Sequence, residues 1–158
     1  MTIAPYRFFL AGIIQGSKQG MDVHNQDYRP VVRGILKESF PGCRILCPVE
    51  NHPDSVAYPD ARARAVFLKH LAEVKRSHGL VVYLPEASMG SAIELWEAFR
   101  EKTLKVTVSP LATNWVVRIL SDKILPDLGA FERFVRSGEM GKVLETRFGA
   151  RNTGEPGP

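Results

Sequence analysis

Cysteine is scarce in this chain: only Cys43 and Cys47 occur among its 158 residues. A disulfide framework or a structural zinc site needs more thiols or ligands than this. On a strand, these two side chains would share one face but lie about 13 Å apart, which is too far for a disulfide. We therefore expect two buried thiols in a reducing cytoplasm, and no metal site.

Long hydrophobic runs are also absent. The longest apolar stretches are short, such as Gly79–Leu84, whereas a membrane-spanning helix needs roughly 20 residues. The apolar N-terminus, residues 1–14, lacks the basic start and the small-residue cleavage site of a signal peptide, so we interpret it as a buried strand. We expect no membrane partner.

Charge of one sign is nowhere concentrated. The net charge is only +4, and no run of Lys and Arg exceeds two residues. A nucleic-acid-binding domain usually gathers its basic residues, so we expect no nucleic-acid partner. A mild positive field suits a small anionic ligand equally well.

The composition that remains is that of one globular domain. Apolar residues make up 44% of the chain and charged residues 24%, and a chain of this length can bury its own core. We expect a single domain over residues 1–150, followed by a disordered tail at 151–158 that is polar and rich in Pro and Gly.

Apolar runs and amphipathic stretches alternate along the domain. The runs predict strands over Tyr6–Gly12, Cys43–Cys47, Gly79–Leu84 and Leu104–Val108. Helices are predicted from Asp22 to about Phe40, from Asp60 to about Ser77, and over Ser91–Glu101, Trp115–Lys123, Asp127–Arg136 and Glu139–Phe148.

This alternation predicts an α/β fold, a doubly wound parallel sheet of about four or five strands with helices on both faces. In such sheets, ligands bind beyond the carboxyl ends of the strands, near the point where the strand order reverses. The candidate site loops are therefore 12–20, 48–58 and 85–91.

The third of these loops has the strongest chemical pattern. Gly90 allows a ligand to approach the backbone closely, and the hydroxyls of Ser88 and Ser91 lie at a helix start, where free N–H groups favour anions. Glu94, about one turn into the helix, would lean back towards the pocket, where a carboxylate can attack an anomeric carbon. The same spacing also fits a capping box in which Ser91 is the cap and Glu94 only closes its own helix.

Two short motifs resemble a known family. Gly90–Ala98, GSAIELWEA, is similar to the Gly-Thr-x-x-Glu-(hydrophobic)-Gly-x-Ala signature of the nucleoside 2-deoxyribosyltransferase-like superfamily, and Phe9–Gly12, FLAG, resembles the Tyr-Leu-Ala-Gly of its first strand. The resemblance covers about residues 6–125. It implies a flavodoxin-like fold and a double displacement, in which Glu94 forms a glycosyl intermediate that passes to another base or to water. We expect no cofactor.

The loop residues depart from the family pattern. Where transferases of the family have an aspartate, this chain has Ser88, a residue that relatives hydrolysing nucleoside 5′-monophosphates use on the phosphate. Those relatives also carry Ser and Arg in the first loop. Here Gly12 is followed by two isoleucines, and the polarity comes from Gln15, Ser17 and Lys18.

Three further residues join the candidate site. His70 stands where the family has a second aspartate, and it either acts as general acid for the departing base or packs as an ordinary helix histidine. His52, in the second loop, is a candidate contact to base or sugar. Asn114 either caps a late helix or reaches into a neighbouring subunit's site, as an asparagine does in some relatives. The resemblance thus implies a homodimer or a larger homo-oligomer.

Several functions remain open at this point. The first is a transferase or hydrolase that cleaves the N-glycosidic bond of a (deoxy)nucleoside or nucleotide, and the second is a nucleoside 5′-monophosphate N-glycosidase. Because both family aspartates are replaced, a catalytically weak nucleotide-binding module is a third, and a plain interaction protein is the fourth. The candidate catalytic residues are Glu94 and His70, and the candidate substrate-binding residues are Gly12, Gln15, Ser17, His52, Ser88, Gly90, Ser91 and Asn114.

Overall fold

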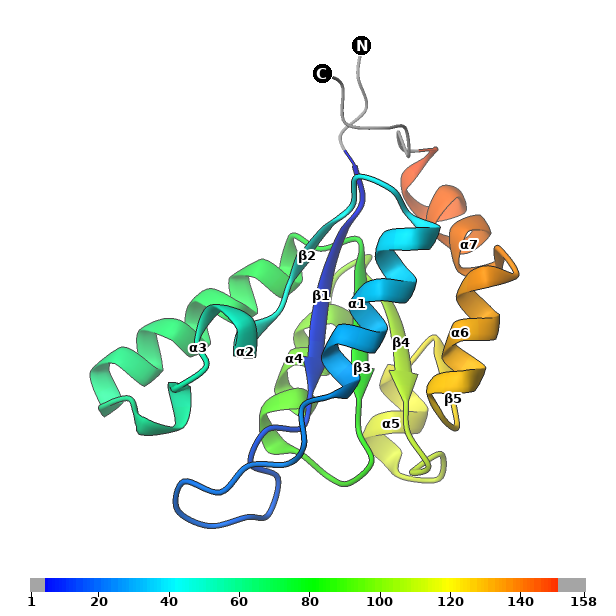
Figure 1. Cartoon of the computed structure of the whole chain (residues 1–158). Coiled ribbons are helices and arrows are strands. Elements are labelled where there is room, and N and C mark those ends of the chain that lie inside the picture. Colours follow the sequence, from blue (N-terminus) through cyan, green and yellow to red (C-terminus); the bar gives the residue numbers. More distant parts are fainter. Residues whose placement is uncertain (1–4, 151–158) are drawn as a thin grey trace.

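The computed structural model describes residues 5–150. Its centre is a parallel sheet with the strand order β2-β1-β3-β4-β5 (Figure 1). The strands are β1 (Arg7–Gly12), β2 (Arg44–Leu46), β3 (Gly79–Tyr83), β4 (Leu104–Val108) and β5 (Lys123–Leu125). This order is that of a flavodoxin-like doubly wound fold, so the predicted fold class is confirmed.

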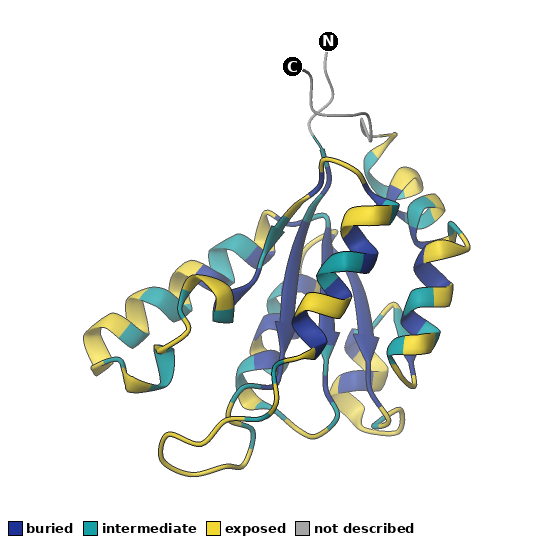
Figure 2. Cartoon of the chain, in the orientation of Figure 1, coloured by how far each residue is buried: buried dark blue, intermediate teal, exposed yellow. Residues whose placement is uncertain are grey.

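Helices cover both faces of the sheet. They are α1 (Tyr28–Ser39), α2 (Pro48–Asn51), the short 3₁₀ helix η1 (Ser55–Ala57), α3 (Asp60–Lys75), α4 (Met89–Phe99), α5 (Trp115–Leu120), α6 (Leu128–Arg136) and α7 (Glu139–Phe148). One apolar core joins the sheet to α1, α6 and α7, and a second joins it to α3, α4 and α5. Figure 2 shows the buried strands between these two helical layers.

Strand β1 shows why the central strands have continuous apolar sequences. Successive side chains of a strand point to opposite faces. Phe8 and Leu10 therefore enter the core beneath α1, while Phe9 and Ala11 enter the core beneath α4. Since helices cover both faces, every position from Phe8 to Gly12 is apolar.

Some element boundaries differ from the sequence predictions. Helix α1 begins at Tyr28 rather than Asp22, which places Pro30 in the first turn, where no intrahelical N–H donor is needed. The helix predicted over Trp115–Lys123 ends at Leu120, and Lys123 begins β5, which pairs with β4. This strand has only three residues. Such a short strand does not produce a recognisable alternation of apolar and polar residues in the sequence.

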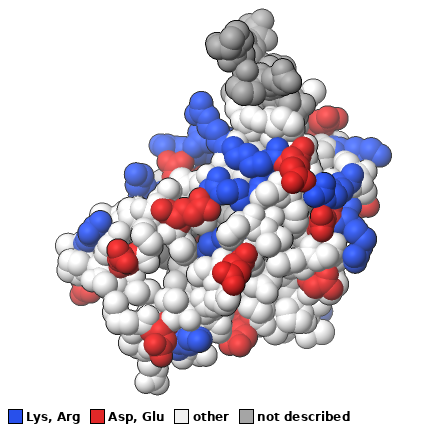
Figure 3. All heavy atoms as spheres, in the orientation of Figure 1, with Lys and Arg blue, Asp and Glu red and all other residues white. Residues whose placement is uncertain are grey.

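The structure also shows the two cysteines and the distribution of surface charge. Cys43 and Cys47 flank β2 and are both buried and free. Figure 3 shows Lys and Arg interspersed with Asp and Glu over one face, with no field of a single sign. Within residues 5–150, no helix is long and apolar enough to cross a bilayer. The predicted tail at 151–158 lies outside the described residues.

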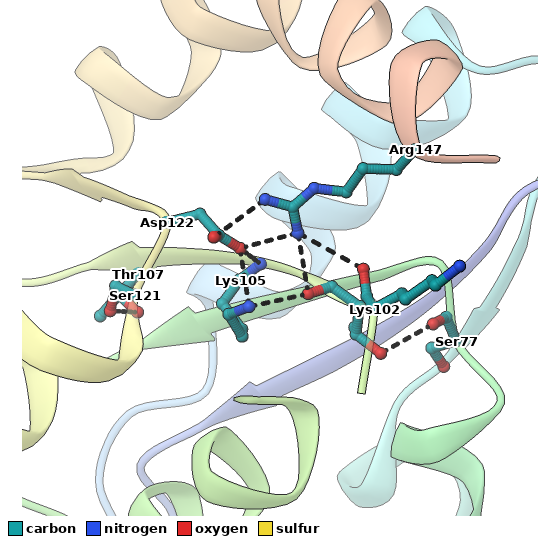
Figure 4. Close-up of polar contacts among 8 residues, drawn as sticks. Ser77, Lys102, Lys105, Thr107, Ser121, Asp122 and Arg147 are labelled. Atoms are coloured by element: carbon teal, nitrogen blue, oxygen red, sulfur yellow. Dashed lines mark hydrogen bonds and ion pairs between the residues drawn. The ribbon is translucent and has the colours of Figure 1, made fainter. Parts of the chain in front are cut away.

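A polar cluster fastens α7 to the amino ends of β4 and β5 (Figure 4). Asp122 lies 3.0 Å from Lys105 Nζ and 2.9 Å from Arg147 Nη2, and it also accepts a hydrogen bond from the Lys105 backbone N–H. Arg147 donates further to the carbonyls of Lys102 and Thr103. The cluster lies at the amino ends of the strands, on the side of the sheet away from their carboxyl ends, so it stabilises the fold without entering the candidate site.

Candidate functional site

The carboxyl ends of β1 and β3 mark the point where the strand order reverses. Gly12 and Tyr83 are paired there, and in doubly wound folds ligands bind just beyond this point. A Cβ atom on Gly12 would lie 2.3 Å from the hydroxyl of Tyr28. Packing alone therefore requires glycine at this position, independently of any ligand.

Helix α4 begins one turn earlier than the capping-box interpretation requires. Ser88 is the N-cap, and its side-chain oxygen accepts a hydrogen bond of 3.4 Å from the Ser91 N–H. Ser91 is already the third residue of the helix, so it does not cap the helix with Glu94 as its partner. The alternative that assigned Glu94 only to its own cap is thus wrong.

Glu94 is a buried carboxyl on the wall of a cavity. Only 8% of its surface is exposed, and it lines a cavity of about 270 Å³ beyond the switch point. Burial raises the pKa of Glu94 to about 8, although the positive charge of Arg29 acts in the opposite direction. At pH 7 the Glu94 carboxyl is therefore mostly protonated.

The same cavity brings together most of the loop residues predicted from the sequence. Gly12, Gln15, Ser88, Gly90, Ser91 and Glu94 all line it. The residues that sequence reasoning missed are Ile14, Gly16, Ser55, Val56, Phe67 and Met89. Ser55 and Val56 lie in the second predicted site loop, whereas Phe67 lies on α3 and no local pattern distinguished it.

A second cavity adjoins the first and is more apolar. It has a volume of about 350 Å³, and its lining shares Gly16, Ser88 and Met89 with the first cavity. Ser17 and Asn114 line this second cavity rather than the cavity of Glu94. The Asn114 side chain accepts hydrogen bonds from the N–H groups of Val116 and Val117, so it caps α5.

The two candidate histidines lie together but outside both cavity linings. The His70 ring packs 6.0 Å from the ring of Phe9 and 5.5 Å from that of His52, and His52 Nδ1 lies 3.1 Å from the Tyr58 hydroxyl. Burial, together with the neighbouring His52, lowers the pKa of His70 to about 4. His70 is therefore neutral at pH 7.

Charge in the two cavities is limited to one side chain. Glu94 is the only ionisable residue among the described residues that line them. Among the described lining residues, the groups that favour an anion include the hydroxyls of Ser17, Ser55, Ser88 and Ser91 and the N-terminus of α4. Within residues 5–150, no three His, Cys, Asp or Glu side chains gather as metal ligands. The arrangement suits an uncharged polar ligand placed against a carboxyl group.

Comparison with known proteins reveals a shared fold at low sequence identity. The 2-deoxyribosyltransferase from Bacillus psychrosaccharolyticus matches with a TM-score of 0.57 and 16% identity, over 80% of this chain and 90% of that chain. A conserved protein from Enterococcus faecalis V583 matches with a TM-score of 0.61 and 16% identity, over 85% and 99% of the two chains.

A third match shows how far the fold extends beyond one activity. A putative pilus assembly-related protein from Burkholderia pseudomallei K96243 has a TM-score of 0.55 and 6% identity, over 96% of this chain and 98% of that chain. No family model matches the chain, and no curated protein matches it significantly. The chain thus shares its flavodoxin-like fold with a 2-deoxyribosyltransferase and with a pilus assembly-related protein, and the fold alone does not assign a function.

Proposed function

We propose that this protein cleaves the N-glycosidic bond of a nucleoside, with Glu94 as the nucleophile. The observation that carries the proposal is the place of Glu94, which lines the switch-point cavity and takes no part in capping α4. Two further observations support it: the fold is similar to that of a 2-deoxyribosyltransferase, and the GSAIELWEA motif resembles the signature of that family.

The reaction would proceed in two displacements. A carboxylate oxygen of Glu94 attacks the anomeric carbon, the bond from this carbon to the base nitrogen breaks, and the base leaves with the bonding electrons and gains a proton. The nitrogen of a second base, or water, then attacks the same carbon, loses its proton to solvent, and the bond to Glu94 breaks to release the carboxylate. Because His70 is neutral at pH 7 and lies outside the linings of both cavities, we assign the proton that the leaving base gains to solvent.

An unphosphorylated nucleoside fits this cavity better than a nucleotide. No Lys or Arg is among the described residues lining it, and burying a phosphate beside a carboxyl without a counter-charge is costly. The second candidate is a nucleoside 5′-monophosphate hydrolase. It is favoured by Ser88 and Ser91, whose hydroxyls line the cavity at the N-terminus of α4.

We further propose that a second copy of the chain covers the apolar cavity. Met89 is 82% exposed and Trp115 73% exposed, and Ile93, Trp96 and Ile119 are exposed beside them on α4 and α5. Such a surface typically marks an interface. Light scattering should show an oligomer that Trp115→Glu dissociates, whereas Val31→Glu on the opposite helical layer should leave it intact. A monomeric parent chain would contradict this proposal.

A substrate panel tests the function. Nucleosides and their 5′-monophosphates are incubated with the protein, with and without an acceptor base, and free base and new nucleoside are separated by chromatography. We expect base release from nucleosides, lost in Glu94→Gln and faster than release from the matching monophosphates. New nucleoside would identify a transferase, and faster cleavage of monophosphates would favour the second candidate. Binding without base release from any substrate would contradict an enzymatic function and indicate a binding module.

A further inference from the structure

Arg29 is a buried charge that the proposed reaction does not use. It is the second residue of α1 and only 2% exposed. Its guanidinium donates hydrogen bonds to the carbonyls of Leu10 (3.1 Å) and Gly12 (3.2 Å). Its Nε donates to the side-chain oxygen of Gln26 at 2.7 Å. The guanidinium thus holds the carboxyl end of β1, and Gly12 at that end lines the cavity of Glu94.

All of these acceptors are neutral. None of the ion pairs among residues 5–150 includes Arg29; the pairs that lie nearest along α1 and α4 belong to Arg33 with Glu50 and to Glu97 with Lys75 and Arg100. An arginine cannot discharge by losing its proton, and a buried charge without a counter-charge is strongly unfavourable.

Arg29 and Glu94 both adjoin the carboxyl end of β1, because Gly12 accepts a hydrogen bond from Arg29 and lines the same cavity as Glu94. The attraction of Arg29 for the carboxylate opposes the burial that raises the pKa of Glu94. The other titratable groups around the pair are Tyr28, whose pKa burial raises far above its usual value, the Cys47 thiol 3.5 Å from Arg29, and Tyr83 against the Tyr28 ring. Arg29 is therefore the one cation found to act on Glu94 in the described part of the chain.

We propose that Arg29 is a positioning residue for Glu94, because its guanidinium fixes the end of β1 beneath the cavity and supplies the positive charge that balances the Glu94 carboxylate. The consequence for catalysis rests on the proposed nucleophilic role of Glu94, since attack requires the carboxylate. The charge balance itself does not depend on any substrate.

The test is the titration of Glu94 in the intact protein, followed by NMR of ¹³C-labelled glutamate side chains. The signal of Glu94 is identified by its loss in Glu94→Gln. Arg29→Gln removes the charge and keeps hydrogen-bond donors, and Arg29→Lys keeps the charge. Arg33→Gln, which removes an exposed cation from the same helix, is the matched control.

We expect Arg29→Gln to raise the titration midpoint of Glu94 by one pH unit or more, and Arg29→Lys and Arg33→Gln to leave it within a few tenths of a unit. The pH at which the rate of base release begins to rise should shift together with the titration midpoint of Glu94. An unchanged midpoint in folded Arg29→Gln overturns the proposal. If that variant does not fold, a shift of one pH unit or more in Arg29→Lys overturns it. Because the titration needs no substrate, a protein inactive on nucleosides leaves this inference standing.

Discussion

As the proposed nucleophile, Glu94 must satisfy two opposing requirements. A nucleophile has to be ionised, but a buried carboxyl resists ionisation, and burial raises the pKa of Glu94 to about 8. We therefore expect the proposed reaction to become faster as the pH rises towards 8. We also expect the stability of the fold to decrease as the pH rises towards 8, because the folded protein holds the proton of Glu94 more tightly than the unfolded chain does.

The pH dependence of folding measures this cost. The pKa of Glu94 rises from its ordinary value of 4.5 to about 8 on folding, so its favourable contribution is complete below pH 4.5 and is lost as the pH rises through 8. The loss is about 1.4 kcal/mol per pH unit between these values. Glu94→Gln should match the parent chain in urea unfolding near pH 5 and exceed its stability at pH 9. Parallel stability curves, like those expected for the exposed control Glu101→Gln, would rule out a buried, protonated Glu94.

The loops that line the site were predictable, although some lining residues within them, such as Ile14 and Ser55, were not singled out. A general rule for parallel sheets identified loops 12–20, 48–58 and 85–91, and it therefore found Gly12, Gln15, Ser88 and Gly90. Phe67 and Arg29 lie on helices instead. Which helix face meets the cavity depends on how α1 and α3 pack on the sheet, and the sequence near those residues does not contain this information.

At the scale of elements, the start of α4 determines what Glu94 can do. Because Ser88 rather than Ser91 caps the helix, Glu94 lies beyond the first turn and lines the cavity. The sequence pattern was consistent with both starting points, since a serine stands at each. Likewise, the continuous apolar runs predicted β3 and β4 well, but the three-residue β5 was hidden at the end of a predicted helix.

Substitution of the cap tests this start of α4. Ser88→Ala removes the oxygen that accepts the Ser91 N–H, and the free energy of unfolding should fall by about 1 kcal/mol. Ser88→Asp keeps an acceptor at the cap, so urea unfolding should show a stability close to that of the parent chain. Equal losses for the Ala and Asp variants would mean that Ser88 does not cap the helix.

At the scale of the whole molecule, the candidate site and the cluster around Asp122 lie at opposite ends of the strands. The cavities lie beyond the carboxyl ends, and the cluster of Asp122, Lys105 and Arg147 lies at the amino ends. Burial alone would raise the pKa of Asp122, but hydrogen bonds from Arg147 and Lys105 outweigh it and hold the pKa below its usual value. The stability from Asp122 is therefore present above its ordinary pKa of 3.8 and is lost as the pH falls below it.

The substitution Asp122→Asn tests whether the Asp122 cluster stabilises the fold independently of the candidate site. It leaves the buried Lys105 ammonium without its counter-charge, so unfolding should become easier by about 3 kcal/mol at pH 7. Glu139→Gln, which removes only an exposed partner of Lys123 at 3.9 Å, should change stability by less than about 0.5 kcal/mol. Base release by the folded Asp122→Asn protein should equal that of the parent chain. A large fall in its turnover at temperatures where it is folded would show that the Asp122 cluster and the candidate site are coupled.

The most direct test of the central claim is to trap the glycosyl enzyme. A 2′-fluoro-arabinonucleoside, whose fluorine slows the second displacement, is incubated with the protein, and intact-mass and peptide mass spectrometry are then recorded. If Glu94 is the nucleophile, we expect a mass increase of one fluorosugar, carried by Glu94 in the peptide that contains Gly90–Ala98 and absent from Glu94→Gln. Base release with no adduct on Glu94, or an adduct on another residue, would contradict it.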